Sequence, residues 1–334
     1  MLKKILRYSL ITLGVVIGLI VVAGLTFRFG GHKLQRAVYF AIVGTTDPFA
    51  LLNQKAPSAT HIAYGPDPLE FGELSVPPRT GPASGTNFPV AILLHGGCWV
   101  STLRGLPPEM TSHDLLRPLA AALVQQGVAT WNVEYRRAGN PGGGWPGTYQ
   151  DLSFAADDLR NLAAANHLDL SRVIVIGHSA GGQLALWLAA RKKLPPDSEI
   201  YQPNPLPIKG VVDIDGPPSL AAASTLDDRV CGAHVIQQFL GGTTQQVPTR
   251  YAQGSAEGLL PTGVPQQLLY SGKTEFLSED RSEWSNLFTN YAAEARKSGD
   301  HVEVTRMDNA GHFDGINPRS KTWPTVLAKI KAAL

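Results

Sequence analysis

Charged residues and cysteines are scarce in this 334-residue chain. Only 17% of the residues are charged, and 29 Lys and Arg nearly balance 27 Asp and Glu, so the net charge is +2. Since no basic block occurs in the body of the chain, we expect no nucleic-acid partner. The hydrophobic content of 43% instead suits a globular fold with a substantial core.

The only cysteines are Cys98 and Cys231. Two cysteines do not make a four-ligand zinc site without suitably spaced histidines or carboxylates, and none are placed that way, so we expect no metal. They could form one disulfide if the body lies outside the cytoplasm, or remain two separate buried thiols. The sequence leaves both possibilities open.

The N-terminus combines positive charge with a long apolar run. Lys3, Lys4 and Arg7 precede an uncharged segment from Tyr8 to Phe27, and about 20 helical residues span about 30 Å, the thickness of a bilayer core. Basic residues before the run favour an inside N-terminus and an exported, periplasmic or extracellular body. We therefore interpret residues 1–30 as a retained membrane anchor.

A cleaved signal peptide is the alternative for the same segment. Val21 and Ala23 resemble a small-residue cleavage site, and cleavage would release a secreted protein. Residues 31–59 are expected to form a membrane-proximal helix or tether in either case.

From residue 60 the sequence predicts a single catalytic domain, residues 60–334. An edge strand or hairpin is expected near Leu69–Val76, and buried strands follow in FPVAILLHGG, VATWNVEYR, RVIVIGHS, IKGVVDIDG, PQQLLYSG and HVEVTRMD. Helical patterns lie between them at 115–126, 151–166, 282–297 and 324–333. Alternating strands and helices predict an α/β fold with a mostly parallel sheet covered on both faces. Residues 217–262, after the sixth strand, are a probable cap insert.

The strongest chemical signal is Gly177-His178-Ser179-Ala180-Gly181. A nucleophile on a sharp strand-to-helix turn needs small neighbours, and this segment lies between a predicted strand and a predicted helix. The helix N-terminus offers free N–H groups to a developing oxyanion. Ser179 is therefore the predicted nucleophile, and the Ala180 N–H a predicted oxyanion donor.

Two further motifs follow strand ends. Gly96 and Gly97, in His95-Gly96-Gly97-Cys98-Trp99, are expected to supply the remaining oxyanion N–H groups. His312, in Asn309-Ala310-Gly311-His312-Phe313, follows the last strand and can reach the same sheet edge as the serine. We predict that His312 is the general base.

Together these motifs resemble one branch of a known superfamily. HGGCW, EYRRAGNPGGGWPGT, GHSAGGQLALW, FLGG, SGKTE and NAGHFDGINP are similar to the esterase and kynurenine-formamidase-like branch of the α/β-hydrolases. The resemblance covers about residues 60–334. It implies a central sheet of about eight strands and a Ser–His–acid triad that cleaves an ester or amide without a cofactor.

The acid of the triad is less certain from the motifs. The family places an Asp in Gly-x-x-Asp after the next-to-last strand, and Gly272-Lys273-Thr274-Glu275 fits with Glu substituted. Glu275 is therefore the predicted acid, with Asp280 and then Glu279 as alternatives. Asp213 and Asp215 also follow a buried strand, but that strand is one too early in the family order.

Other residues near these motifs have weaker signals. Trp99, Trp145 and His178 are candidates for the substrate pocket, although an aromatic residue is nearly as often structural. Glu134 and Arg136 straddle a strand end and are expected to form a structural ion pair.

The sequence thus favours a serine carboxylesterase acting on small or medium esters. An arylformamidase-like amidase is the first alternative, and a non-catalytic, membrane-tethered binding protein on a hydrolase scaffold is the second. The expected partners are a small-molecule substrate and, through the N-terminus, a membrane.

Overall fold

The computed structural model describes residues 31–79, 87–103, 106–232, 234–273 and 282–334. It divides into two units, residues 1–47 and 48–334. In the first, the described helix is α2 (Gly31–Val43), and Arg36 Nε donates a hydrogen bond of 3.1 Å to Asp47. Among the described residues no helix has the length and apolar character needed to cross a bilayer. The predicted anchor, residues 1–30, lies outside them.

The second unit is built on an eight-stranded sheet in the order β1-β2-β4-β3-β5-β6-β7-β8. The strands are β1 (Thr60–Ala63), β2 (Phe71–Ser75), β3 (Phe88–Leu94), β4 (Ala129–Val133), β5 (Leu168–His178), β6 (Gly210–Ile214), β7 (Gln266–Ser271) and β8 (Val302–Met307). Pairing is antiparallel from β1 to β2 and from β2 to β4, and parallel across the other strands. The predicted sheet is confirmed.

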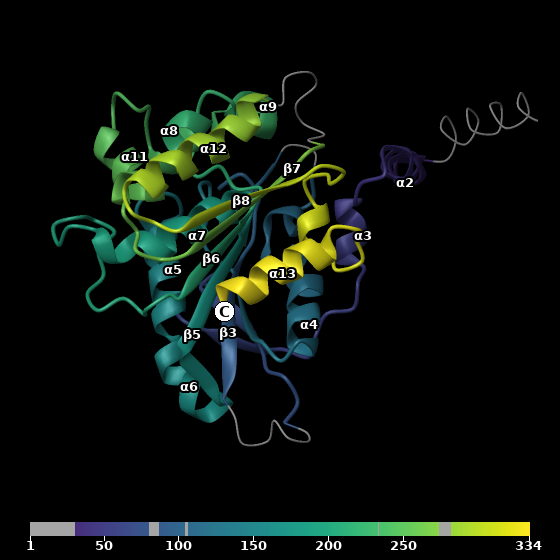
Figure 1. Ribbon diagram of the computed structural model, residues 1–334, viewed down its shortest axis with the longest axis horizontal. Helices are drawn as coiled ribbons and strands as arrows, with labels where there is room; N and C mark the ends of the chain where they lie inside the picture. The colour runs from purple at the N-terminus through teal and green to yellow at the C-terminus, as the bar shows by residue number, and fades with distance from the viewer. Residues whose placement is uncertain (1–30, 80–86, 104–105, 233, 274–281) are drawn as a thin grey trace, which may run out of the picture. The chain divides into compact units, whose positions relative to one another are not determined.

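Helices cover both faces of this sheet (Figure 1). One core contains residues of α5 (Gly147–Asp157), α6 (Leu159–Asn166), α7 (Ala180–Ala190) and α12 (Ser282–Lys297). The other contains residues of α3 (Pro48–Leu52), α4 (Arg117–Gln125) and α13 (Trp323–Ala333). Strand β3 shows why: Ile92 and Leu94 enter the first core and Ala91 and Leu93 the second, because successive side chains on a strand point to opposite faces.

Two helical boundaries differ from the sequence prediction. Residues 151–166 form two helices, α5 and α6, which meet at Asp158, and the first begins earlier, at Gly147. Helix α3 was expected within a tether at 31–59, yet its Leu51 is fully buried in the second core. Burial of that side chain places α3 within the second unit.

The segment 217–262 folds into short helices above the carboxyl ends of the strands. They are α8 (Leu220–Ala223), α9 (Asp227–Cys231), α10 (Val235–Leu240) and α11 (Pro248–Gly254), followed by a 3-10 turn at Ala256–Leu259. Figure 1 shows α8, α9 and α11 grouped with α12 at one end of the unit. Residues of these helices join the first core, so the segment is packed onto the domain.

Replacing Leu51 with Ala tests whether α3 stabilises the second unit. Loss of a fully buried leucine leaves a cavity, and we expect the free energy of unfolding to fall by about 3 kcal/mol. The control is Ile42→Ala in α2, where the side chain is 80% exposed and little change is expected. Chemical denaturation measures both, and equal effects would contradict the assignment of α3.

Candidate active site

Ser179 lies on a strained turn between β5 and α7. Its backbone is left-handed, with φ of 56° and ψ of −126°, a conformation that a residue with a Cβ rarely adopts. Glycines make the turn possible, because a Cβ at Gly177 would collide with the Gly181 carbonyl and one at Gly181 with the carbonyls of Leu94 and His95. The tight turn that the motif predicts is therefore present, and its packing leaves room only for glycine at these two positions.

The neighbouring strand fixes the backbone of the elbow. The Ser179 N–H donates to the carbonyl of Ile214, the last residue of β6, at 2.8 Å. Helix α7 then begins at Ala180, so its first N–H groups lie beside the serine. The end of β6 and the start of α7 together position Ser179.

The loop after β3 packs directly against the elbow. A Cβ at Gly96 would lie 2.9 Å from Cβ of Ser179, so only glycine leaves room for this approach. Gly97 has φ of 117°, and left-handed backbone continues through Cys98 and Trp99. This conformation turns the chain sharply at the end of β3, next to Ser179.

Contacts to two other segments hold that loop. The Trp99 indole Nε1–H donates to Gln183 Oε1 in α7 at 3.1 Å, and Gln183 Nε2 donates to the Gly254 carbonyl at 2.7 Å. Beyond the indole, Val100 pairs with Ala138. The loop is thus tied to the helix that follows the serine and to the cap.

His312 lies in the turn after β8 and is only 6% exposed. The turn is closed by a 2.6 Å hydrogen bond from the Gly311 N–H to the Asp314 carboxylate. His178 Nε2 donates to the His312 carbonyl at 2.9 Å. Burial, followed by the charge of His312, lowers the pKa of His178 to about 3, so His178 stays neutral and supports this turn.

A buried carboxylate lies against His312. Oδ2 of Asp215, directly after β6, is 3.6 Å from Nδ1 of His312, and Asp215 is completely buried. Its other oxygen accepts hydrogen bonds from the Ser271 N–H at 2.8 Å and the Trp284 indole at 3.3 Å. The order of strands in the family gave no reason to expect Asp215 here.

The predicted acid Glu275 and its alternatives Glu279 and Asp280 lie outside the described residues.

Ser179 and His312 line the same cavity, of about 290 Å³. Its other walls are largely apolar and come from the β3 loop, the segment before α4 and the cap; they include Leu103, Leu106, Met110, Leu115 and Val230. A second cavity of about 20 Å³ lies on another side of Ser179, among Trp99, Pro217, Ile236 and Trp284. The serine therefore faces one large and one very small apolar space.

Comparison with known proteins identifies the family. Residues 80–278 match the model of the BD-FAE family. The chain belongs to the BD-FAE family.

Relatives of this BD-FAE protein agree with that placement. A probable carboxylesterase 4, mitochondrial, of Arabidopsis thaliana is 24% identical over 270 residues, covering 74% of this chain and 66% of the plant protein. Esterase B from Lactobacillus rhamnosis matches with a TM-score of 0.68 at 16% identity, over 90% of this chain and 93% of that one. A bacterial heroin esterase matches with a TM-score of 0.62 at 19% identity, over 91% of both chains. The BD-FAE protein is a carboxylesterase-like hydrolase with the α/β-hydrolase fold.

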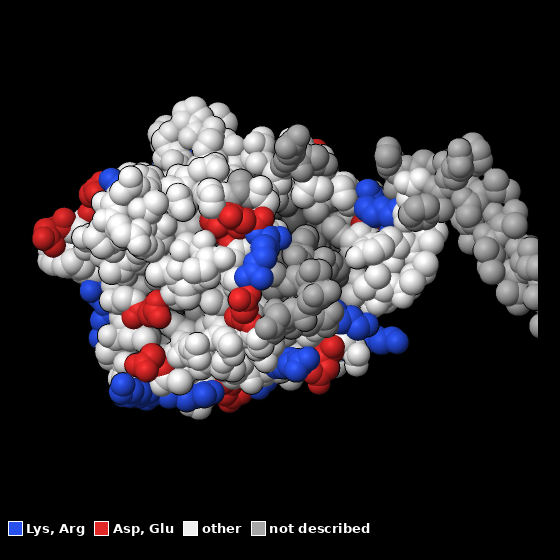
Figure 2. Space-filling view, turned by 90° about the horizontal axis from the view of Figure 1, so that it is seen from above, with Lys and Arg blue, Asp and Glu red and all other residues white. Residues whose placement is uncertain are grey.

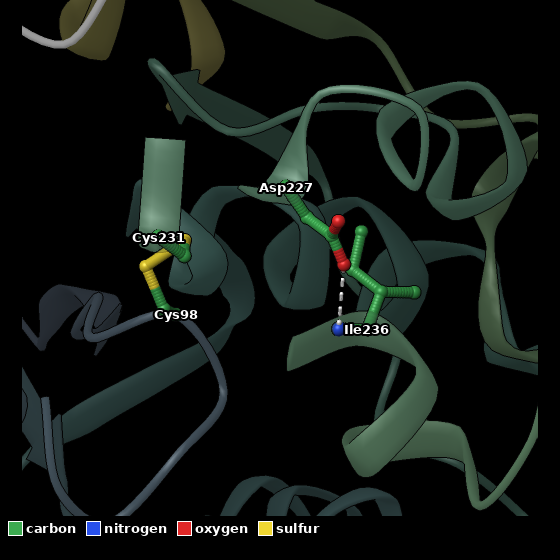
Figure 3. Close-up of a disulfide and its surroundings, with 4 residues drawn as sticks. All are labelled: Cys98, Asp227, Cys231 and Ile236. Atoms are coloured by element: carbon green, nitrogen blue, oxygen red, sulfur yellow. Dashed lines mark hydrogen bonds between the residues drawn. A yellow bond between two sulfur atoms is a disulfide. The ribbon is translucent and has the colours of Figure 1, made fainter. Parts of the chain in front are cut away.

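A disulfide joins the β3 loop to the cap of this BD-FAE protein. Cys98 and Cys231 are bonded, with Cα atoms 6.0 Å apart and a sequence separation of 133 (Figure 3). Next to it, the Asp227 carboxylate accepts a hydrogen bond of 3.2 Å from the Ile236 N–H, which joins α9 to α10. Both cysteines line the large cavity, so the crosslink is part of its wall.

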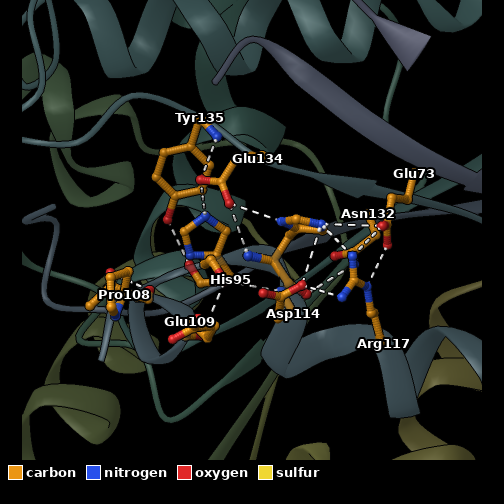
Figure 4. A network of polar contacts seen from close by, with 12 residues as sticks. Glu73, His95, Pro108, Glu109, Asp114, Arg117, Asn132, Glu134 and Tyr135 are labelled. Carbon is orange, nitrogen blue, oxygen red and sulfur yellow. Dashed lines mark hydrogen bonds and ion pairs between the residues drawn. The ribbon is translucent and has the colours of Figure 1, made fainter. Parts of the chain in front are cut away.

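A buried polar network packs against His95, at the start of the β3 loop (Figure 4). His95 stacks on Tyr135 with ring centroids 4.2 Å apart, and the Tyr135 hydroxyl donates to the His95 carbonyl at 2.6 Å. His95 Nε2 lies 3.2 Å from Oε1 of Glu134. Burial lowers the pKa of His95, so the imidazole directly before the two glycines is neutral.

The network continues outward to α4. Glu134 Oε2 is 2.9 Å from His113 Nδ1, and His113 Nε2 is 3.3 Å from Glu73, which also pairs with Arg117 at 2.5 Å. Burial alone would lower the pKa of His113, but hydrogen bonds and charges of Glu134 and Glu73 outweigh it and raise that pKa to about 9. His113 is therefore a cation between two carboxylates at neutral pH.

The expected ion pair between Glu134 and Arg136 is wrong. Glu134 pairs with the two histidines and with Arg137, whereas Arg136 binds Asp151 at 2.5 Å and Glu70 at 2.8 Å. Strand β4 ends at Val133, and beyond it successive side chains turn to different neighbours.

The three pocket candidates occupy different places. His178 lines the large cavity and Trp99 the small one. Trp145 packs edge-to-face on Tyr149, with the Arg250 guanidinium 5.7 Å from its ring, and so belongs to the packing of α5 against α11.

In the described part of the chain, Asp227, Asp228 and His234 bring possible metal ligands together, but His234 Nδ1 already pairs with Asp228 at 2.7 Å.

The raised pKa of His113 predicts a pH dependence of stability. A pKa raised from 6.5 to about 9 on folding contributes stability that is complete below pH 6.5 and is lost as the pH rises toward 9. We expect the free energy of unfolding to decline across this window, and His113→Gln to flatten the decline. Denaturant titrations at several pH values measure it; parallel curves for the two proteins would refute the assignment.

Removing the crosslink should destabilise the protein. Closing a loop of 133 residues restricts the unfolded chain by about 5 kcal/mol in the loop-entropy model. The double substitution Cys98→Ser with Cys231→Ser, which leaves no free thiol, should lower the free energy of unfolding by up to that amount. Wild-type protein treated with a reductant serves as the matched sample and should melt at the same lower temperature. A melting temperature unaffected by reductant would show that the bond is absent.

Proposed function

We propose that this protein hydrolyses small or medium, uncharged carboxylic esters with Ser179 as nucleophile. The observation that carries the proposal is the shared cavity, onto which the strained Ser179, the buried His312 and the glycines of the β3 loop all open. A serine is a weak nucleophile until a base within reach accepts its proton, and His312 is the base that this cavity offers.

The reaction follows from this arrangement. His312 accepts the proton of Ser179 as Oγ attacks the ester carbonyl, and the backbone N–H groups of Gly96, Gly97 and Ala180 hold the oxyanion. Collapse of the tetrahedral intermediate expels the alcohol, which takes its proton from His312. Water, deprotonated by the same imidazole, then releases the acid from Ser179 and restores the enzyme.

The walls of the cavity support an uncharged substrate. A volume of about 290 Å³ lies at the lower end of the range for small-molecule sites. Apolar side chains, glycines and the disulfide make up most of the lining of the large cavity, and it contains no Asp, Glu, Lys or Arg among the described residues. On the face seen in Figure 2, blue and red residues are interspersed among uncharged ones. The printed names of the relatives, a carboxylesterase and esterases, also favour ester hydrolysis.

The disulfide supports an exported catalytic unit. Structural disulfides persist in oxidising compartments and are rare in the cytosol. Together with the basic, apolar start of the sequence, Cys98–Cys231 favours attachment through residues 1–30 with the enzyme outside the cytoplasm.

Labelling with a fluorophosphonate tests the proposed nucleophile. Folded wild-type protein should carry the label on Ser179 and hydrolyse p-nitrophenyl acetate, while Ser179→Ala should lose both properties and His312→Gln should lose turnover by about 10⁴-fold or more. Peptide mapping by mass spectrometry locates the label. Absence of label at Ser179 would refute the proposal, and faster hydrolysis of N-formylkynurenine than of the ester would redirect it to an amidase.

A further inference from the structure

We propose that Asp215 is the carboxylate that orients His312 for catalysis. The inference rests on the proposed serine hydrolase and extends it, because it assigns the third member of the triad to the end of β6. Asp215 acts through His312 and does not touch the substrate, so it is a positioning residue.

The backbone at the end of β6 is built to present this side chain. Asp215 has φ of 57°, a left-handed conformation that Asp tolerates better than most residues, and its N–H donates to the Leu269 carbonyl of β7 at 2.8 Å. The residue before it, Ile214, accepts the hydrogen bond from the Ser179 N–H. One strand end therefore holds the nucleophile through Ile214 and faces the base through Asp215.

The two carboxylate oxygens of Asp215 have different surroundings. Oδ1 accepts from the Ser271 N–H and the Trp284 indole, which fixes the plane of the group. Oδ2 is buried and has no hydrogen-bond donor in the described part of the chain, and it lies 3.6 Å from His312 Nδ1. An unpaired buried carboxylate oxygen is costly in free energy. A shift of a few tenths of an ångström would bring Oδ2 within hydrogen-bond distance of Nδ1 of His312.

That contact selects the protonation state that catalysis needs. A carboxylate at Nδ1 holds the proton there, which leaves Nε2 free to accept the proton of Ser179. When the imidazolium forms, the charge-assisted hydrogen bond shortens and strengthens, and hydrogen bonds that are long in the free enzyme commonly tighten at this stage.

Two other carboxylates of the described chain near this site have contacts of their own. Asp213, two residues earlier, accepts the Gly216 N–H at 2.8 Å and packs against Gly182. Burial, with the charge of Asp215 as a further contribution, raises the pKa of Asp213. Around His312 lie the neutral His178 from β5 and, on its own turn, Asp314, which caps the Gly311 N–H.

The order of the strands in the sheet explains how the end of β6 can supply the acid. Strands β6 and β7 pair in parallel, and β8 pairs with β7, so their carboxyl ends lie side by side at one edge. A carboxylate at either of the first two ends can reach an imidazole carried by the third. The position after β6 is thus available without any change in the fold.

Paired substitutions test the inference. In Asp215→Asn we expect kcat to fall by about 10³- to 10⁴-fold with KM little changed, because Asn cannot stabilise the imidazolium and can hold the wrong tautomer. The acidic limb of the kcat/KM profile should move to lower pH, since the substitution removes a negative charge that favours the imidazolium form. Asp213→Asn is the matched control, at the same strand end and equally buried, and should keep both turnover and pH profile.

Three further results would decide against Asp215. Near wild-type kcat and an unshifted pH profile in folded Asp215→Asn would overturn the inference, and a loss of 10³-fold or more in Glu275→Gln beside it would assign the acid to Glu275. If Asp215→Asn does not fold, a crystal structure of wild-type protein phosphonylated at Ser179 decides: Nδ1 of His312 within about 3.2 Å of Asp215 supports it, and contact with Glu275 instead refutes it. Wild-type protein that is neither labelled nor active would instead refute the proposed function.

Discussion

The left-handed backbone of Ser179 is the constraint on which the site depends. It is tolerated because three neighbours lack side chains: Gly177 and Gly181 within the turn, and Gly96 across from it. The same absence of Cβ atoms lets β3, β5 and the start of α7 approach one another closely. The strain that exposes the serine and the proximity of the N–H groups of the β3 loop therefore have one cause, and neither can be altered without the other.

A second constraint is electrostatic and lies behind the β3 loop. The loop would be free to move if only glycines formed it, but His95 is stacked on Tyr135 and faces Glu134, which is itself paired with His113 and Arg137. These contacts hold His95, directly before the two glycines, against the residues that follow β4. The N–H groups proposed to hold the oxyanion are thus supported by charges that extend outward to α4.

Short sequence patterns predicted most of this structure, whereas contacts between residues far apart in the sequence could not be predicted. The strands, the serine elbow, the glycine loop and the His312 turn are each encoded within about ten residues, so their sequence patterns were sufficient. Strand order gives no reason to place Asp215 beside His312, and only the folded turn shows where its carboxylate points. The pairing of Cys98 with Cys231 and the partners of Glu134 likewise depend on contacts across the chain, which periodicity does not contain.

The disulfide Cys98–Cys231 joins the cap to the β3 loop. Cys98 directly follows Gly97, so any displacement of α9 acts through the disulfide on the loop proposed to hold the oxyanion. The indole of Trp99, one residue further, is tied through Gln183 to Gly254 at the other end of the cap. Two independent tethers therefore connect the walls of the large cavity to the β3 loop. In this arrangement the shape of the large cavity and the geometry of the β3 loop cannot vary separately. For the proposed esterase, a substitution in the cap that changes substrate preference should therefore also change the rate of acyl transfer.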